Sequence, residues 1–85
     1  MKFTIYTTNW CAYCKAAKQL LRSRGFDFSE INLEEKGMDR EDLYELTGER
    51  TVPQILMNGN PIGGFDDLQK LHASGKLTED SHLTN

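Results

Sequence analysis

Positive charge and long hydrophobic runs are both scarce in this sequence. The 85-residue chain has 10 basic residues against 13 acidic ones, and its formal net charge is -3. Such a balance offers no attraction for a phosphate backbone or an anionic membrane surface, which disfavours nucleic acid as a partner. No stretch approaches the roughly 18 apolar residues of a membrane-spanning helix, and the N-terminal residues lack the pattern of a secretory leader. We therefore expect a cytoplasmic protein with no membrane segment.

Cysteine is equally scarce, because the chain has only Cys11 and Cys14, both within the stretch TTNWCAYCKAAKQLL. A disulfide across so short a loop would remove little entropy from the unfolded chain, worth roughly 2 kcal/mol. A structural zinc site needs four ligands, and His72 and His82 do not have the spacing of a zinc-binding pair. Structural roles are therefore disfavoured. In a reducing compartment, two such thiols favour transient redox chemistry.

The first third of the chain predicts a strand, a helix and a second strand. Residues 2–7 are β-branched and aromatic, and apolar residues recur at helical spacing over 12–24, ahead of Gly25. Apolar residues then alternate over 26–33, which indicates a second strand. Strand, helix and strand within so short a span predict a βαβ unit with parallel strands and a right-handed crossover.

The rest of the chain predicts a helix over 38–48, a hairpin over 52–65 and a helix over 66–75. The complete order, βαβ followed by α, ββ and α, predicts an α/β fold with a small mixed sheet and helices on both faces. We expect one domain over 1–85 with a polar, frayed tail over 76–85.

The two cysteines lie where the first strand gives way to the first helix. Unpaired N–H groups and the helix dipole at that point favour the thiolate form of Cys11, which predicts that Cys11 is the nucleophile. Cys14 follows one turn later on the same helical face, within reach of a disulfide to Cys11. A C-x-x-C sequence beside a βαβ pattern is typical of thioredoxin-like redox proteins.

Proline is rare, and one of the two prolines, Pro53, stands where the third strand should begin, in TVPQI. Proline cannot donate to a β-ladder, so it is uncommon inside strands. One interpretation is a cis Val52-Pro53 bond that turns the main chain of Val52 toward a ligand. The alternative is an ordinary edge-strand proline.

Three motifs in this order, W-C-A-Y-C, T-V-P and G-G-F-D-D, make residues 2–75 resemble the glutaredoxin family. The resemblance implies a thioredoxin-like fold with a four-stranded mixed sheet. It also implies a monomeric, glutathione-dependent oxidoreductase that reduces protein disulfides and protein-glutathione mixed disulfides. The first cysteine of the motif corresponds to Cys11 and the second to Cys14.

By the same resemblance, glutathione would occupy a site beside Cys11. Tyr13 would form one wall, and the main chain of Thr51 and Val52, ahead of Pro53, would pair with the tripeptide in the manner of an added strand. Arg40 would approach the glycyl carboxylate, where a guanidinium group fits well. The alternative is that Arg40 is a solvated surface charge.

The γ-glutamyl end of glutathione would lie at the start of the last helix. There Gly63 and Gly64 allow close approach, and helix N–H groups beside Phe65 and Asp66 suit a carboxylate. Asp66 would face the ligand's ammonium group. An alternative is that Asp66 and Asp67 only cap the helix.

Two residues depart from the family pattern. Ala12 replaces a proline common between the first cysteine and the tyrosine, and with Trp10 it motivates an alternative function as a carrier of a [2Fe–2S] cluster. That cluster would be held between two subunits by Cys11 and glutathione. Thr8 replaces a common lysine, which predicts weaker attraction for the carboxylates of glutathione. Further alternatives are an electron donor to ribonucleotide reductase and a non-catalytic interaction module.

Overall fold

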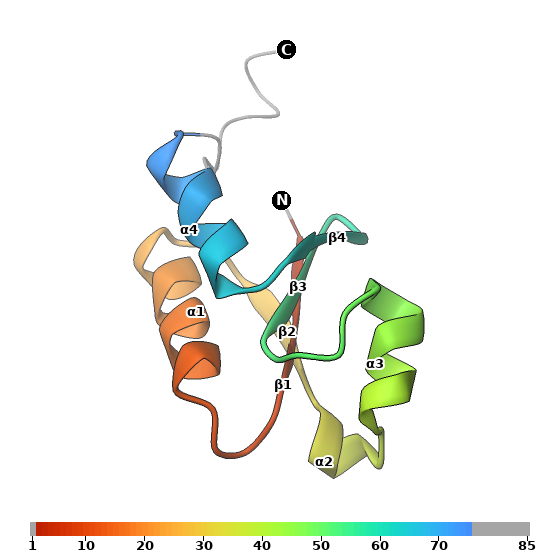
Figure 1. The fold of residues 1–85 in the computed structure, drawn as a ribbon. Coiled ribbons are helices and arrows are strands. Elements are labelled where there is room, and N and C mark those ends of the chain that lie inside the picture. Colours follow the sequence, from red (N-terminus) through yellow and green to blue (C-terminus); the bar gives the residue numbers. More distant parts are fainter. Residues whose placement is uncertain (1, 76–85) are drawn as a thin grey trace.

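A twisted mixed sheet separates two pairs of helices (Figure 1). The structure is a computed structural model that describes residues 2–75, and the frayed tail predicted for 76–85 lies outside the described residues. One four-stranded sheet has the order β2-β1-β3-β4. Its strands are β1 (Phe3–Thr7), β2 (Phe28–Asn32), β3 (Gln54–Met57) and β4 (Asn60–Gly63).

The central strand β1 is parallel to β2 on one side and antiparallel to β3 on the other. Phe3 is opposite Phe28 in the first pair and opposite Met57 in the second. The β3–β4 hairpin turns at Asn58 and Gly59, which both have positive φ, as a two-residue hairpin turn requires. This arrangement confirms the predicted mixed sheet and hairpin.

Two helices cover each face of the sheet. In Figure 1, α1 and α4 lie on one side, and α2 and α3 lie on the other. Their bounds are α1 (Ala12–Ser23), α2 (Leu33–Lys36), α3 (Arg40–Thr47) and α4 (Phe65–Ala73). None of these described helices has the length and apolar composition needed to span a membrane. The sequence predicts three of them but not α2, which follows β2 directly.

The alternation of side chains along β1 creates two cores. Phe3 and Ile5 point to the α1–α4 side, where Leu21 and Leu68 complete a fully buried cluster. Tyr6 points to the opposite face and packs with Leu33 of α2 and Leu43 of α3. Because successive strand residues face opposite sides, one strand contributes to both cores and packs against both helical layers.

Removing apolar volume from the α1–α4 core should destabilise the protein strongly. Leu68 of α4 is 0% exposed, so we expect Leu68→Ala to lower the free energy of unfolding by about 2 to 5 kcal/mol. Leu46 of α3 is 50% exposed, and Leu46→Ala serves as the control, with an expected loss of less than about 1 kcal/mol. Urea denaturation followed by circular dichroism measures both. Equal losses would contradict the assignment of the core.

Candidate active site

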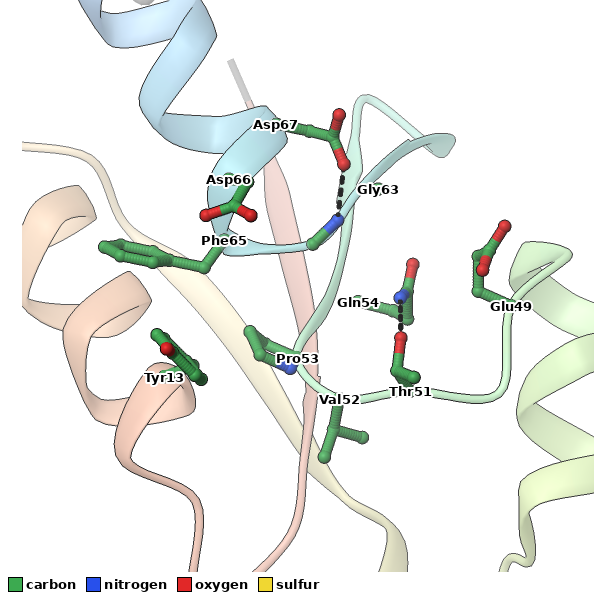
Figure 2. Close-up of a pocket in the computed structure, with 11 residues that line it drawn as sticks. Tyr13, Glu49, Thr51, Val52, Pro53, Gln54, Gly63, Phe65, Asp66 and Asp67 are labelled. Atoms are coloured by element: carbon green, nitrogen blue, oxygen red, sulfur yellow. Dashed lines mark hydrogen bonds between the residues drawn. The ribbon is translucent and has the colours of Figure 1, made fainter.

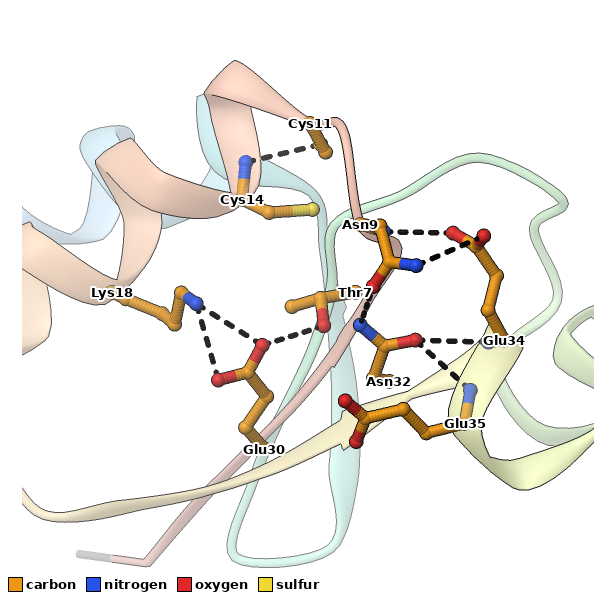
Figure 3. Close-up of polar contacts among 9 residues, drawn as sticks. All are labelled: Thr7, Asn9, Cys11, Cys14, Lys18, Glu30, Asn32, Glu34 and Glu35. Carbon is orange, nitrogen blue, oxygen red and sulfur yellow. Dashed lines mark hydrogen bonds and ion pairs between the residues drawn. The ribbon is translucent and has the colours of Figure 1, made fainter.

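Cys11 is the N-cap of α1. Its extended main chain (φ -135°, ψ 105°) places its sulfur to accept a hydrogen bond from the Cys14 N–H, at 3.1 Å (Figure 3). The first turn of α1 contains no acidic side chain, so nothing in that turn opposes a negative charge on the sulfur. The Cys11 sulfur therefore lies at the main-chain N–H groups that begin α1.

The loop before β3 lies against the same sulfur. The Val52-Pro53 peptide bond is cis, as the first interpretation of this proline expects. Contact of the Val52 main chain with a ligand stays a prediction. The Cys11 thiol donates to the main-chain oxygen of Val52 at 3.8 Å. Residues about forty positions apart in the sequence thus form one site, beyond the end of β1 and the beginning of β3, the two inner strands of the sheet.

Cys14 differs from Cys11 in its surroundings although both are free thiols. Cys11 is partly exposed, whereas Cys14 is 2% exposed beneath it. Burial is the largest cause that raises the pKa of Cys14 to about 12, and the hydrogen bond with Cys11 is the second. The Thr8 amide and the charge of Lys18 lower this pKa. Cys14 is therefore protonated at neutral pH, and Cys11 is the thiol placed to react first.

A hydrogen-bonded network holds the loop that precedes Cys11. Asn9 donates to Glu34 from its main chain at 2.8 Å and from its side chain at 3.2 Å. Its side-chain oxygen accepts from Asn32 at 2.8 Å, and Asn32 in turn caps α2. Figure 3 shows these contacts beside the two cysteines. The unpredicted helix α2 therefore positions the cysteine loop.

A second network lies on the other side of Cys14. Lys18 Nζ contacts both carboxylate oxygens of Glu30 at 3.1 Å, and the buried Thr7 hydroxyl donates to Glu30 at 2.7 Å. Partial burial acts to raise the pKa of Glu30, but these hydrogen bonds and the charge of Lys18 hold it below its ordinary value. The network links α1 to the β1–β2 pair and fixes a positive charge near Cys14.

A pocket of about 460 Å³ opens between the cis-proline loop and the start of α4 (Figure 2). Tyr13 forms one wall, and its ring lies 6.0 Å from that of Phe65, centroid to centroid. The lining residues come from three segments and are Tyr13, Glu49, Thr51, Val52, Pro53, Gln54, Gly63, Gly64, Phe65, Asp66 and Asp67.

The structure brings most of the predicted glutathione-site residues together at this pocket. Its lining includes Tyr13, Thr51, Val52, Pro53, Gly64, Phe65 and Asp66. Arg40 is not among them. It lines a separate hollow with the 95% exposed Trp10, and its Nη1 donates to the main-chain oxygen of Arg50 at 2.9 Å. Contact of Arg40 with a glycyl carboxylate stays a prediction.

The glycines at the start of α4 are needed for this geometry. Gly63 has a φ of +111°, and a Cβ atom there would collide with the Asp67 carboxylate. The same carboxylate accepts from the Gly64 N–H at 3.0 Å, so Asp67 caps α4. A Cβ on Gly64 would lie 3.3 Å from the main-chain oxygen of Pro53, which shows how closely α4 approaches the cis-proline loop.

Sequence reasoning missed Glu49 and Gln54, which also line the pocket. The Gln54 side chain is 2% exposed and donates from Nε2 to the Thr51 hydroxyl at 3.1 Å. Its Oε1 is buried without a hydrogen-bond partner in the described part of the chain. The only sequence signal was position: Gln54 follows Pro53 directly, and Glu49 follows the glycine that ends α3.

Within residues 2–75, no group of histidine, cysteine and acidic side chains is arranged to hold a metal ion. The chemistry that the described site supports is thiol exchange at Cys11. A partly exposed sulfur at a helix N-terminus, a buried second thiol in hydrogen-bond contact and an adjoining pocket are parts that such exchange can use.

Comparisons with known proteins agree with this arrangement. The sequence model of the glutaredoxin family matches residues 3–62. A glutaredoxin from Pseudomonas aeruginosa is 49% identical over 73 residues, which cover 86% of this chain and 87% of the relative. Glutaredoxin 3 from Escherichia coli K12 is 44% identical, with 86% and 88% covered.

Solved structures show the same similarity. The buckwheat glutaredoxin–glutathione complex has a TM-score of 0.80 at 30% identity, covering 88% of this chain and 71% of that one. A glutaredoxin from Brucella melitensis has a TM-score of 0.75 at 38% identity, covering 91% and 84%.

The different surroundings of the two thiols predict selective alkylation. Iodoacetamide at neutral pH should modify Cys11 in the native protein and leave Cys14 unmodified, because Cys14 is buried and has a pKa of about 12. Peptide mass spectrometry identifies the modified residue. In concentrated guanidinium chloride both thiols should react.

A Cys11→Ser variant separates the effect of burial on the pKa of Cys14 from the effects of Cys11 itself. Burial is the larger cause and remains in this variant, so Cys14 should still react slowly and should gain reactivity only at strongly alkaline pH. Rapid alkylation of Cys14 in folded Cys11→Ser would contradict this.

Proposed function

The chain belongs to the glutaredoxin family and is a thiol oxidoreductase, and on that premise we propose that it depends on glutathione and reduces protein-glutathione mixed disulfides and protein disulfides. The observation that carries the proposal is the partly exposed Cys11 sulfur at the tip of α1, in contact with the cis-proline loop that also lines the pocket. The solved complex of the buckwheat relative with glutathione supports the choice of ligand.

The proposed ligand placement uses main-chain groups at both ends of the pocket. The cysteinyl part of glutathione would pair with the main chain of Val52, which would hold its sulfur near Cys11. The γ-glutamyl carboxylate would accept from N–H groups in the first turn of α4, and Asp66 would attract the ammonium group. Both interactions use residues that already line the pocket.

In the proposed first step, the Cys11 thiolate attacks the glutathionyl sulfur of a mixed disulfide. A bond forms between Cys11 and glutathione, the original disulfide bond breaks, and the electron pair leaves with the substrate thiolate, which then takes a proton from water. The thiolate of a second glutathione attacks the glutathionyl sulfur bonded to Cys11. This step releases the Cys11 thiolate together with glutathione disulfide.

A second branch uses Cys14. When Cys11 is bonded to a protein substrate, Cys14 must lose its proton before it attacks the Cys11 sulfur, expelling the substrate thiolate and forming a Cys11–Cys14 disulfide. Bonding of Cys11 removes one cause of the raised pKa of Cys14, while burial remains. Two glutathione molecules then reduce the disulfide. Because burial still raises the pKa of Cys14, we expect the route through a second glutathione to be favoured over the route through Cys14.

Several finer assignments extend the same proposal. We place the activity in the cytoplasm of a cell that maintains glutathione, with the protein acting as a monomer on glutathionylated or disulfide-containing proteins. Ribonucleotide reductase is one such candidate. A [2Fe–2S] cluster stays an alternative. Each chain would supply only Cys11 as a protein ligand, since residues 2–75 contain no cluster of side chains that could hold a metal ion. Visible spectra after anaerobic reconstitution test it, and a colourless monomer would exclude it.

The two cysteines should differ in their effect on deglutathionylation. Cys14→Ser should turn over a glutathionylated peptide at a rate comparable to the wild type, because the first route needs only Cys11 and glutathione. Cys11→Ser should fall to the uncatalysed rate. A coupled assay with glutathione reductase measures both. Activity in Cys11→Ser together with its loss in Cys14→Ser would reassign the nucleophile.

Adding a cation near the site should improve binding of glutathionylated substrate. Thr8 is half-buried next to the cysteine loop, and we expect Thr8→Lys to lower the KM by about two- to fivefold, the size of an exposed ion-pair interaction. Ser29→Lys, on the exposed side of β2, makes the same charge change away from the site and should leave KM unaltered. Equal KM values for Thr8→Lys and the wild type would contradict the prediction.

A further inference from the structure

Lys18 and Cys14 lie one turn apart on the same face of α1, because they are separated by four residues. Most lysine side chains extend into solvent, but the Lys18 side chain is only 20% exposed. Its Nζ contacts both carboxylate oxygens of Glu30 at 3.1 Å. The ammonium group therefore lies between α1 and β2 instead of in open solvent (Figure 3).

Thr7 and Thr8 connect this ion pair to the buried sulfur. The Thr7 hydroxyl is buried and donates to the Glu30 carboxylate at 2.7 Å. The main-chain N–H of the next residue, Thr8, interacts with the Cys14 sulfur. Because Thr7 and Thr8 are joined by one peptide bond, the same short stretch of main chain holds both the ion pair and the sulfur.

Few charged groups act on Cys14 within the described residues. Cys11 acts through a hydrogen bond and through its charge, and Lys18 acts through its charge. Glu30 faces Lys18 from β2 and partly neutralises it, and the charge of Arg22, one turn further along α1, acts on Glu30. Once Cys11 is bonded to a substrate, its sulfur carries no charge. Of these groups, Lys18 is then the one whose charge favours a thiolate at Cys14.

Stability alone does not account for the position of Lys18. An exposed ion pair contributes little to stability, and a partly buried pair must offset the lost hydration of both charges. Holding a long lysine side chain in one conformation also costs entropy. The position is instead suited to chemistry, since a buried thiol such as Cys14 reacts only after its thiolate has formed.

We propose that Lys18 promotes the attack of Cys14 on a disulfide at Cys11, and that Glu30 and Thr7 hold Lys18 where it can do so. Lys18 does not line the pocket beside Cys11 and acts through Cys14, so it is a positioning residue. The inference rests on the proposed function, because it concerns the branch of that reaction in which the Cys11–Cys14 disulfide forms.

The step that Lys18 assists begins with Cys11 bonded to glutathione. Cys14 gives its proton to solvent, and its thiolate attacks the Cys11 sulfur. A bond forms between the two cysteines, the bond between Cys11 and glutathione breaks, and the electron pair leaves with the glutathione thiolate, which takes a proton from water. The charge of Lys18 increases the thiolate fraction of Cys14. It also lowers the nucleophilicity of that thiolate, but only about half as much on a logarithmic scale, so the step becomes faster.

The decay of a glutathionyl adduct on Cys11 measures this step directly. The reduced protein takes glutathione from an excess of glutathionylated peptide at acidic pH, where Cys14 is protonated, and is then transferred to neutral pH without free glutathione. Intact-mass spectrometry after acid quenching follows conversion of the adduct to the Cys11–Cys14 disulfide. In Cys14→Ser the adduct should persist, which assigns the decay to Cys14.

Two substitutions of Lys18 separate its charge from its packing. Lys18→Met keeps the apolar stem and removes the charge, and it should slow adduct decay about two- to fourfold. Lys18→Arg keeps the charge and can pair with Glu30, so it should retain the wild-type rate. Lys15→Met is the matched control, because it removes a positive charge from the exposed side of α1, and it should leave the rate unaltered.

Glu30→Gln should change the rate in the opposite direction. The amide oxygen remains an acceptor for Lys18 and Thr7, but the charge that opposes Lys18 is removed, so we expect adduct decay about twofold faster. The same charges act on Cys14 in a Cys11→Ser background. There, at one fixed alkaline pH, iodoacetamide should modify Cys14 more slowly with Lys18→Met and faster with Glu30→Gln.

The outcomes separate this inference from the proposed function. Equal decay rates in Lys18→Met and the wild type would overturn the inference. Equal slowing in Lys18→Met, Lys18→Arg and Glu30→Gln would also overturn it, by showing that the ion pair only supports the structure. Turnover of glutathionylated peptide by Cys14→Ser would leave the proposed function standing after either result. Failure of the reduced protein to take glutathione from the peptide faster than the uncatalysed reaction would overturn both proposals.

Discussion

The hydrogen bond from the Cys14 amide to the Cys11 sulfur is the interaction on which the rest of the site depends. It forms because β1 ends at Thr7 and α1 begins at Ala12, so that Cys11 is the first residue outside the helix and meets its unpaired N–H groups. The Asn9–Glu34–Asn32 network holds the connecting loop in this position. The Cys11 sulfur is therefore held between main-chain groups, the Cys14 N–H and the Val52 oxygen.

Burial then gives the two cysteines unequal roles. They are separated by one helical turn, yet the turn carries Cys14 beneath the surface while Cys11 stays at its edge. Because burial and Cys11 raise the pKa of Cys14, this thiol stays protonated and does not act as a nucleophile until Cys11 has formed a disulfide. The charge of Lys18 lowers the pKa of Cys14 in part. Glu30, which also accepts from Thr7, holds Lys18 in place. The division between a surface nucleophile and a buried second thiol thus follows from helix geometry and packing.

Three chain segments meet at the pocket, and all the charged side chains that they contribute to its lining are acidic. Gly63 and Gly64 let α4 approach the Pro53 loop closely enough to close one side. The arginines that could have balanced the acids instead contact Glu41, Tyr44 and a main-chain oxygen. The described lining of this pocket therefore offers acidic side chains and no cationic one to a ligand.

Local patterns in the sequence were sufficient for most of the fold. Composition predicted β1, alternation predicted β2, and the Asn58–Gly59 turn predicted the hairpin of β3 and β4, because these signals depend on a few neighbouring residues. Helical spacing predicted α1 in the same way. The helix α2 was missed, since four residues carry no periodicity and its formation depends on the Asn32 cap. The positions of Cys11, Cys14 and Pro53 likewise identified the redox centre. Tertiary structure alone decided that Cys14 is buried, that Glu49 and Gln54 line the pocket, and that Arg40 lies outside it, because burial and side-chain direction arise from contacts between segments distant in the chain.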